Sequence, residues 1–112
     1  MLKITLLTEG EKLSLRLEGH AGYAEPDKDI ICASASILAH VVAHDVDLLD
    51  RFNAYEEPAV IRLESGDAEI TCVPTKASEH IRDTYVFAGK GFCLLAQNYP
   101  QYVELITDVE DD

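Results

Sequence analysis

The spacing of apolar residues along the chain switches from every second residue to helical spacing and back, and it does so twice. This succession restricts the fold more than any other feature of the sequence. Each alternating stretch is long enough for two strands joined by a polar turn, as in a β-hairpin. The expected strands cover residues 2–8, 13–18, 60–64 and 68–73, and a short fifth strand is expected at 102–107.

Two helices are expected, one after each hairpin. From Ile30 to Asp50 the apolar residues form one helical stripe, and Asp29 just before it suits an N-cap. The residues assigned to this stripe are Ile30, Ser34, Ile37, Leu38, Val41, Val42, Leu48 and Leu49. A second helix is expected to open at Pro74 and to end near Asn98. The order ββαββαβ predicts an α+β fold, a two-layer sandwich with both helices packed on one mixed or antiparallel sheet.

Length and charge limit the possible classes of function. The 112 residues suffice for one domain, 1–112. Nine Lys and Arg against 21 Asp and Glu give a net charge of −12, which disfavours direct nucleic-acid binding and favours a basic partner. No apolar run reaches the length of a membrane span, and the N-terminus lacks a signal-peptide core. Three unclustered cysteines argue against a disulfide framework, so we expect a soluble cytoplasmic protein that ends in an acidic tail, 108–112.

One cysteine and one histidine stand out as candidates for chemistry. Cys32 falls in the first turn of the expected helix, where free backbone N–H groups and the helix dipole favour a thiolate. His20 precedes it across the polar loop 19–29, which can bring imidazole and thiol together. Such a pair is the minimum for nucleophilic acyl chemistry. Ser36 lies one turn further along the helix, although a surface cysteine near a histidine often has no function.

The other histidines and cysteines named below are better explained as ordinary side chains without a chemical role. His40 lies eight residues along the helix from the thiol, about 12 Å away and beyond hydrogen-bond reach. His40 and His44 have metal-ligand spacing but lack the glutamate of metalloproteases, and His44 is expected to be partly buried. Cys72 and Cys93 are expected to be buried small hydrophobes, and their spacing does not recommend a zinc site. We therefore expect neither a metal nor another cofactor.

Two short motifs resemble the ribosomal-processing cysteine protease family (Prp). The first is Gly19-His20-Ala21-Gly22-Tyr23-Ala24-Glu25, and the second is Asp29-Ile30-Ile31-Cys32-Ala33 with Ser36. The family pattern is a GHA, a short loop with glycine, and then D-I-x-C-A-x-x-S. The closing residues 99–103 also resemble the family, and the likeness in element order covers nearly the whole chain.

The resemblance implies a cytoplasmic bacterial endopeptidase that acts as a homodimer. The family removes a short N-terminal extension from ribosomal large-subunit protein twenty-seven, so the implied partner is a basic ribosomal protein precursor. Carried over, Cys32 is the nucleophile and His20 the general base. Asp29 is expected to accept the backbone N–H of Cys32, and Ser36 to donate a hydrogen bond to the sulfur or to the substrate carbonyl.

The loop between the two motifs is expected to be a mobile substrate lid. Its expected substrate-contacting residues are Gly19, Ala21, Gly22, Tyr23 and Asp27. The family often has glycine where Asp27 stands, and Asp tolerates a left-handed backbone better than most residues. Without apolar periodicity to pin it, the loop is expected to order on substrate binding and to bring His20 to Cys32.

Two other functions fit the same residues. One is a non-catalytic acidic binding module or ribosome-assembly factor with an inert Cys32. The other is a different Cys–His acyl-transfer enzyme, such as a small amidase. The second helix is apolar nearly all round, with Val86, Phe87, Cys93 and Leu94 off its main stripe, which favours a homodimer in any of these cases.

Overall fold

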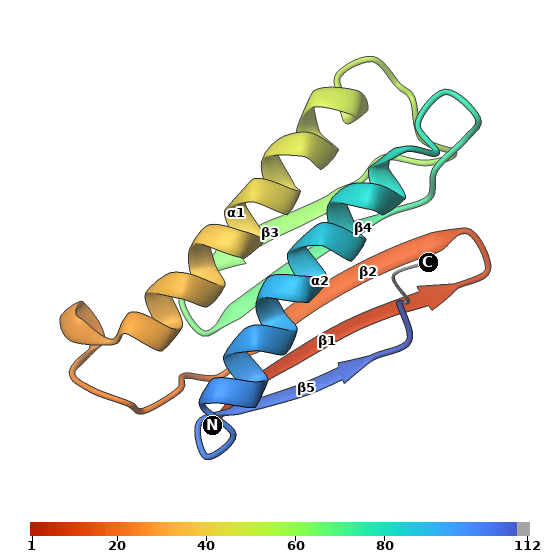
Figure 1. The fold of residues 1–112 in the computed structure, drawn as a ribbon. Coiled ribbons are helices and arrows are strands. Elements are labelled where there is room, and N and C mark those ends of the chain that lie inside the picture. The colour runs from red at the N-terminus through yellow and green to blue at the C-terminus, as the bar shows by residue number, and fades with distance from the viewer. Residues whose placement is uncertain (110–112) are drawn as a thin grey trace.

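A computed structural model describes residues 1–109 of the chain and confirms the expected order of elements (Figure 1). The elements are β1 Leu2–Glu9, β2 Lys12–Glu18, a 3₁₀ turn η1 Pro26–Lys28, α1 Ile30–Asp50, β3 Val60–Glu64, β4 Asp67–Cys72, α2 Ile81–Asn98 and β5 Val103–Thr107. Most of the expected acidic tail, residues 110–112, lies outside the described residues. Asp108, at its start, accepts a hydrogen bond from the Thr8 N–H at 2.8 Å.

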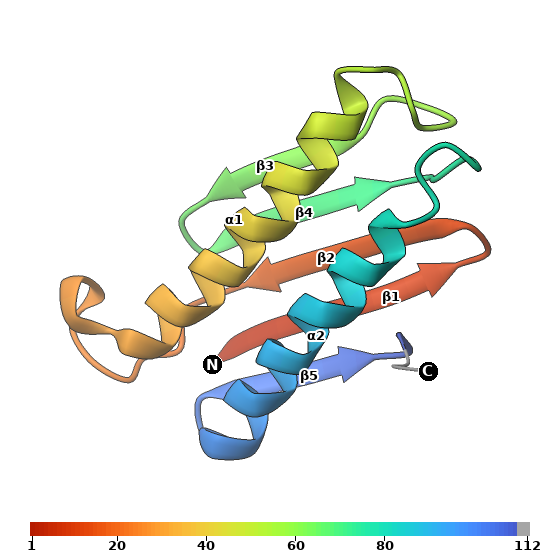
Figure 2. The same cartoon turned by 45° about the horizontal axis from the view of Figure 1, so that its top comes forward.

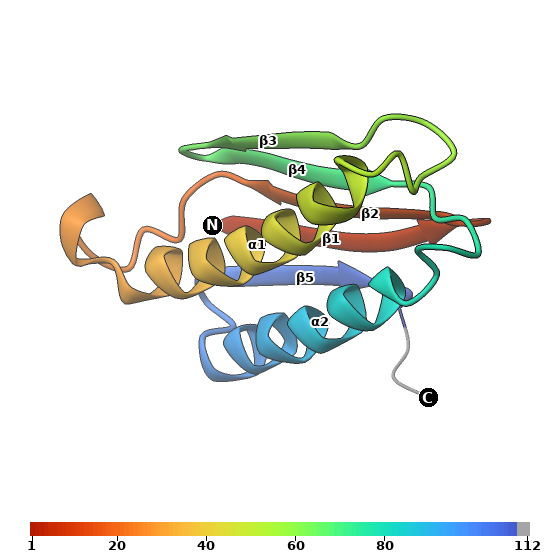
Figure 3. The same cartoon turned by 90° about the horizontal axis from the view of Figure 1, so that it is seen from above.

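The five strands form one mixed sheet in the order β3-β4-β2-β1-β5. Three neighbouring pairs are antiparallel, and β5 runs parallel to β1 at the edge. Both helices lie on the same face of this sheet, α1 over the β3–β4 side and α2 over the β1–β5 side (Figures 2 and 3). The expected two-layer α+β sandwich is therefore correct.

The core lies between the helices and the sheet. Alternate strand residues such as Ile4, Leu15 and Ile70 are fully buried, and each contributes about 1.5–3 kcal/mol by leaving water. The two helices approach closely where Gly91 faces Leu38, because a Cβ at Gly91 would lie 2.7 Å from Leu38 Cδ1. Gly91 thus leaves space for the Leu38 side chain between the helices, which gives a packing reason for a glycine inside α2.

The inward face of α1 differs from the stripe expected from the sequence. The buried residues are Ile31, Ala35, Ala39, Val42, Ala43 and Val46. Most of the large residues of the expected stripe point outward: Ile30, Ile37, Val41 and Leu48 are 53, 62, 51 and 42% exposed. The expectation was wrong because it favoured large side chains, whereas alanines allow the helix to lie close to the sheet.

With its apolar outer face, α1 is long and apolar enough to cross a membrane, judged by length and composition only. Its inner face nevertheless packs on the sheet as part of the core, with Ile31, Val42 and Val46 fully buried. In this structure α1 is therefore a core helix.

The second helix begins at Ile81 and not at Pro74, so the expected start was wrong. Pro74 pairs with Tyr55 in an isolated β-bridge. The hydroxyls of Thr75 and Ser78 each donate to the Ala54 carbonyl at 2.7 Å. These contacts hold the segment as a turn against a distant loop, which local helix signals do not reveal.

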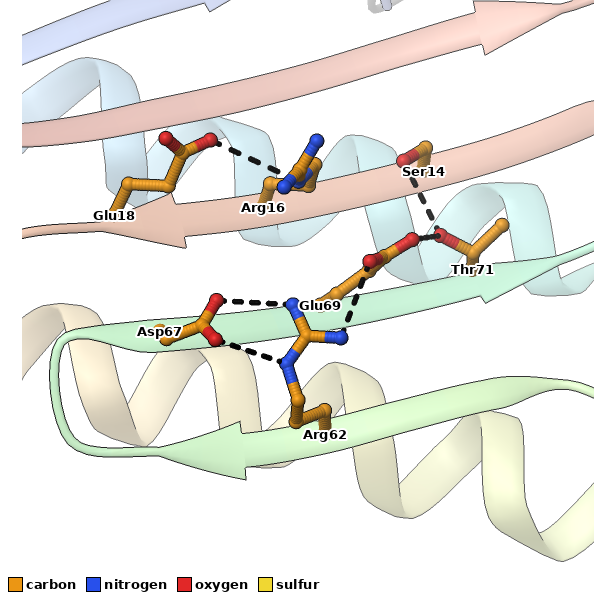
Figure 4. Close-up of polar contacts among 7 residues, drawn as sticks. All are labelled: Ser14, Arg16, Glu18, Arg62, Asp67, Glu69 and Thr71. Carbon is orange, nitrogen blue, oxygen red and sulfur yellow. Dashed lines mark hydrogen bonds and ion pairs between the residues drawn. The ribbon is translucent and has the colours of Figure 1, made fainter.

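On the sheet face opposite the helices, polar side chains lie side by side on β2, β3 and β4 (Figure 4). Arg62 on β3 donates two hydrogen bonds to Asp67 on β4, at 2.9 and 3.2 Å, and one to Glu69 at 3.4 Å. The Arg62 guanidinium lowers the pKa of the Asp67 carboxyl. This bidentate pair ties β3 to β4 next to the turn that joins them.

Candidate active site

The candidate nucleophile lies in the first turn of α1, and Asp29 caps that turn. One carboxylate oxygen of Asp29 accepts the backbone N–H groups of Ile31 and Cys32 at 3.1 and 3.0 Å. The expected hydrogen bond from Cys32 to Asp29 is therefore present. The cap fixes the direction in which the Cys32 side chain leaves the helix.

The other carboxylate oxygen of Asp29 holds the loop that precedes the helix. It accepts the N–H groups of Tyr23 and Ala24 at 3.0 and 3.4 Å. The hydrogen bond from Cys32 is the main cause that lowers the pKa of Asp29, although the carboxyl is only 5% exposed and burial opposes the shift. Asp29 thus joins the loop and the helix through a single buried charge.

The sulfur of Cys32 has a backbone partner in the same loop. The N–H of Ala21 donates to Cys32 Sγ at 3.4 Å, and Ala21 is buried. The residue next to Ala21 is His20, so this contact also brings the backbone of the candidate base to the thiol. Because Asp29 accepts the N–H of Cys32 itself, the N–H directed at the sulfur comes from the loop and not from the helix.

The His20 ring is exposed and lies against Gly66 in the β3–β4 turn. His20 and Cys32 both line one cavity of about 360 Å³ between the N-terminal half of α1 and that turn. Within residues 1–109 no hydrogen bond joins the two side chains. The structure thus brings them to one site, and the imidazole has to turn toward the sulfur to take its proton, as is common without substrate.

Ser36 and His40 lie further along the same cavity. The Ser36 hydroxyl lies 3.4 Å from His40 Nδ1, and that nitrogen lies 2.7 Å from the Ser36 carbonyl. In the described chain Ser36 has no hydrogen bond to the sulfur, so only the substrate remains as its expected partner. From the sequence we expected His40 to lie too far from the Cys32 thiol for a hydrogen bond. The cavity nevertheless extends along α1 far enough to include His40.

The loop before α1 has anchors that the sequence did not reveal. The Tyr23 ring packs edge-on against Tyr99 at 5.8 Å and against Tyr102 at 5.3 Å. Together with buried Ala21 and the Asp29 hydrogen bonds, these contacts hold the loop at several points. Mobility of the loop stays a prediction, but the expected absence of anchors was wrong.

Asp27 does not need a left-handed backbone. It is exposed and lies inside the 3₁₀ turn η1, and among the described residues only Asn53 combines a side chain with a positive φ. Gly19 and Gly22 take the positive φ values in this loop. Aspartate is therefore compatible with the loop shape at position 27.

The other cysteines and histidines are only partly as expected. Cys72 is buried, as predicted, and its sulfur lies 3.7 Å from the Tyr85 hydroxyl, while burial raises its pKa. Cys93 is half-buried and His44 is exposed, so both expectations of burial were wrong. Across residues 1–109, no three His, Cys, Asp or Glu side chains are arranged to hold a metal ion.

Residues of the β3–β4 turn were missed as part of the site. Glu64, Ser65, Gly66 and Asp67 line the cavity opposite α1. They lie more than thirty residues after Cys32 in the chain, and only the sheet order brings them to the end of β2. No local pattern marks them as functional.

Comparison with known proteins identifies the family. The sequence profile of the family described as cysteine protease Prp matches residues 1–104. None of the curated protein sequences is similar to the chain.

Solved structures with the same fold include a ribosomal processing protease Prp from S. aureus in complex with a covalently linked product peptide. It has a TM-score of 0.64 at 20% identity and covers 96% of this chain and 100% of its own. The same S. aureus protease with a substrate peptide gives a TM-score of 0.62 at 16% identity, with coverage of 96 and 100%. SMU.848 from Streptococcus mutans gives 0.63 at 24% identity, with coverage of 96 and 93%. Because the family profile spans nearly the whole sequence, the chain belongs to the cysteine protease Prp family and is a peptide hydrolase.

Proposed function

We propose that this protease removes the short N-terminal extension of ribosomal large-subunit protein twenty-seven, with Cys32 as nucleophile and His20 as general base. The observation that carries the mechanism is the shared cavity. A thiol at a capped helix N-terminus and an exposed imidazole line the same space, and a backbone N–H next to the histidine contacts the sulfur. The S. aureus relative binds a substrate peptide and a covalently linked product peptide, which supports the same chemistry here.

In the proposed reaction the His20 imidazole takes the thiol proton, and Cys32 Sγ attacks the carbonyl carbon of the scissile bond. The C–N bond then breaks, and the imidazolium gives its proton to the departing amine. The N-terminal extension remains on Cys32 as a thioester. Water, activated by His20, releases it as a carboxylic acid and restores the thiol.

Three N–H groups in the first turn of α1 are already bonded to Asp29 and are not free to bind the oxyanion. The Asp29 side chain accepts hydrogen bonds from the N–H groups of Ile31 and Cys32, and the Asp29 backbone carbonyl accepts one from the N–H of Ala33. The N–H of Ala21 is the donor that contacts the reacting sulfur. We therefore assign the Ala21 N–H as an oxyanion donor, because the negative charge moves from the sulfur to the oxygen on the carbonyl carbon that the sulfur attacks, next to a donor already directed at that sulfur.

Charge supports a basic substrate. The net charge is −12, and acidic side chains on both sides of the cavity, Asp27 on the loop and Glu64 near the β3–β4 turn, add to it locally. A negative surface attracts a basic ribosomal protein and speeds its encounter. The proposed location is the cytoplasm, where such precursors are made. All three cysteines are free, as is usual for proteins of that reducing compartment.

A homodimer is the proposed assembly. On α2, Phe87 and Leu94 are 76 and 59% exposed, and on α1 Ile37 and Val41 point away from the sheet. Because both helices cover the same sheet face, their outer sides face the same direction (Figure 3). Exposed apolar side chains of this size favour burial against a second copy.

Cleavage of the precursor tests the proposed function. Wild-type protein should cut a peptide that spans the extension and the following residues, whereas Cys32→Ala and His20→Ala should not cut it. Cys93→Ala is the matched control, because it removes another half-buried helical thiol and should cleave normally. Binding of the peptide without cleavage by the wild type would instead favour the acidic binding module.

A further inference from the structure

The β3–β4 turn forms the wall of the cavity that faces the candidate base. Its two central residues are Ser65 and Gly66, between the paired residues Glu64 and Asp67. Figure 2 shows this turn beside the end of β2 and the first turns of α1. The proposed reaction gives no task to this turn.

Gly66 is in contact with the His20 ring. A Cβ built on Gly66 would lie 2.8 Å from His20 Nε2, 3.1 Å from Cε1 and 3.5 Å from Cδ2. These three atoms form the outer edge of the imidazole and include Nε2, one of the two ring nitrogens that can carry the proton. The ring therefore occupies the space that any side chain at position 66 would need.

The backbone on both sides of this contact is fixed. The N–H of Gly19, the residue before His20, donates to the Gly66 carbonyl at 2.9 Å. A Cβ at Gly19 would lie 2.8 Å from the Met1 carbonyl oxygen, so this position has no room for a side chain. On the turn side, the Arg62–Asp67 pair holds the two strands together directly beside Gly66 (Figure 4).

We propose that Gly66 is a positioning residue for the reaction. Because it has no side chain, it leaves the space in which the His20 imidazole lies at the edge of the Cys32 cavity. The inference rests on the proposed role of His20 as general base. Because the turn is tied by Arg62 and by the Gly19 hydrogen bond, a side chain at position 66 displaces the ring and leaves the turn in place. The ring is the end of a flexible side chain, so the fold tolerates this displacement, but the imidazole then no longer starts from the cavity edge, from which it turns toward the sulfur.

Gly66→Ala tests this role, and Gly10→Ala is the matched control. Both glycines lie in hairpin turns with positive φ, +74 and +62°, so both substitutions impose a similar backbone strain. A Cβ at Gly10 meets nothing within 4 Å, and its turn lies at the opposite end of the sheet (Figure 1). Only Gly66→Ala should therefore change the environment of His20.

The first measurement is the NMR signal of the His20 ring in the full-length protein. Its Cε1–H and Cδ2–H resonances should move in Gly66→Ala and stay unchanged in Gly10→Ala. Unchanged His20 resonances in a folded Gly66→Ala protein would overturn the proposal. This measurement needs no substrate, so its outcome is independent of whether the proposed precursor is cleaved.

The second measurement is a double-mutant comparison of peptide cleavage and of Cys32 alkylation. Gly66→Ala should lower kcat/KM by at least about tenfold, since a positioned general base contributes about 10²–10⁴-fold. His20→Ala should not cleave the peptide, so in that background the comparison uses alkylation alone, and Gly66→Ala should have no further effect on the alkylation rate. Equal losses with and without the imidazole, or a loss no larger than that of Gly10→Ala, would show that Gly66 does not act through His20.

Discussion

Replacing Asp29 with asparagine separates the two tasks that this carboxylate performs. Its oxygens accept four backbone N–H groups, two from the start of α1 and two from the preceding loop. Asparagine has one acceptor oxygen, and its NH₂ group would face two N–H donors. Since asparagine is as good an N-cap as aspartate, we expect the amide oxygen to stay with Ile31 and Cys32 and the loop to lose its partner.

The cost follows from the two hydrogen bonds lost by Tyr23 and Ala24, at 3.0 and 3.4 Å. Asp29 is only 5% exposed, so solvent does not replace them fully. Two bonds to a charged acceptor, one of them long, amount to about 2 kcal/mol. That loss lowers Tm by about 8 °C in a domain of this size. Asp29→Ala, which removes both pairs, should cost about twice as much.

Urea unfolding and amide hydrogen exchange measure both parts of this prediction. The N–H groups of Tyr23 and Ala24 should lose protection in Asp29→Asn, while those of Ile31 and Cys32 keep it. Because the pKa of Asp29 is lower in the folded than in the unfolded protein, its stabilisation is complete at pH 7 and disappears as the pH falls below about 4. The reasoning is refuted if all four amides change alike, or if the stability difference is the same at pH 7 and in acid.

Three further outcomes follow from the site and the surface. Iodoacetamide should modify Cys32 before buried Cys72, and His20→Ala should slow that reaction; first modification of Cys72 with activity retained would contradict the site. Light scattering at micromolar concentration should give twice 12.4 kDa, and Phe87→Glu should yield a folded monomer; a monomeric wild type would contradict the dimer. Hydrogen exchange in the loop 19–29 should slow when substrate peptide binds, and equal protection with and without peptide would argue against a closing lid.

Features that depend on local spacing could be predicted from the sequence. Alternating residues such as Leu13, Leu15 and Leu17 determine which strand face is buried, and they do so in the structure. Asp29 could be identified as a cap because it stands just before the helical stripe, a local relation that the helix geometry imposes. The fold class and the helix start at the site followed from such relations.

Features that depend on distant partners could not be predicted. The inward face of α1 is set by how closely alanines let the helix approach the sheet, and not by the size of its apolar residues. The turn at Thr75 and Ser78 depends on the Ala54 carbonyl more than twenty residues upstream. Gly66 belongs to the site only because β4 pairs with β2, which places its turn against His20.

The identity of the covalent intermediate tests the central claim most directly. A precursor peptide mixed with wild-type protein and quenched in acid during turnover should give an intact mass equal to the protein plus the N-terminal extension less one water. Digestion should place that adduct on Cys32, and the species should be missing from Cys32→Ala. An adduct on another residue, or cleavage at an undiminished rate by folded Cys32→Ala, would contradict the mechanism.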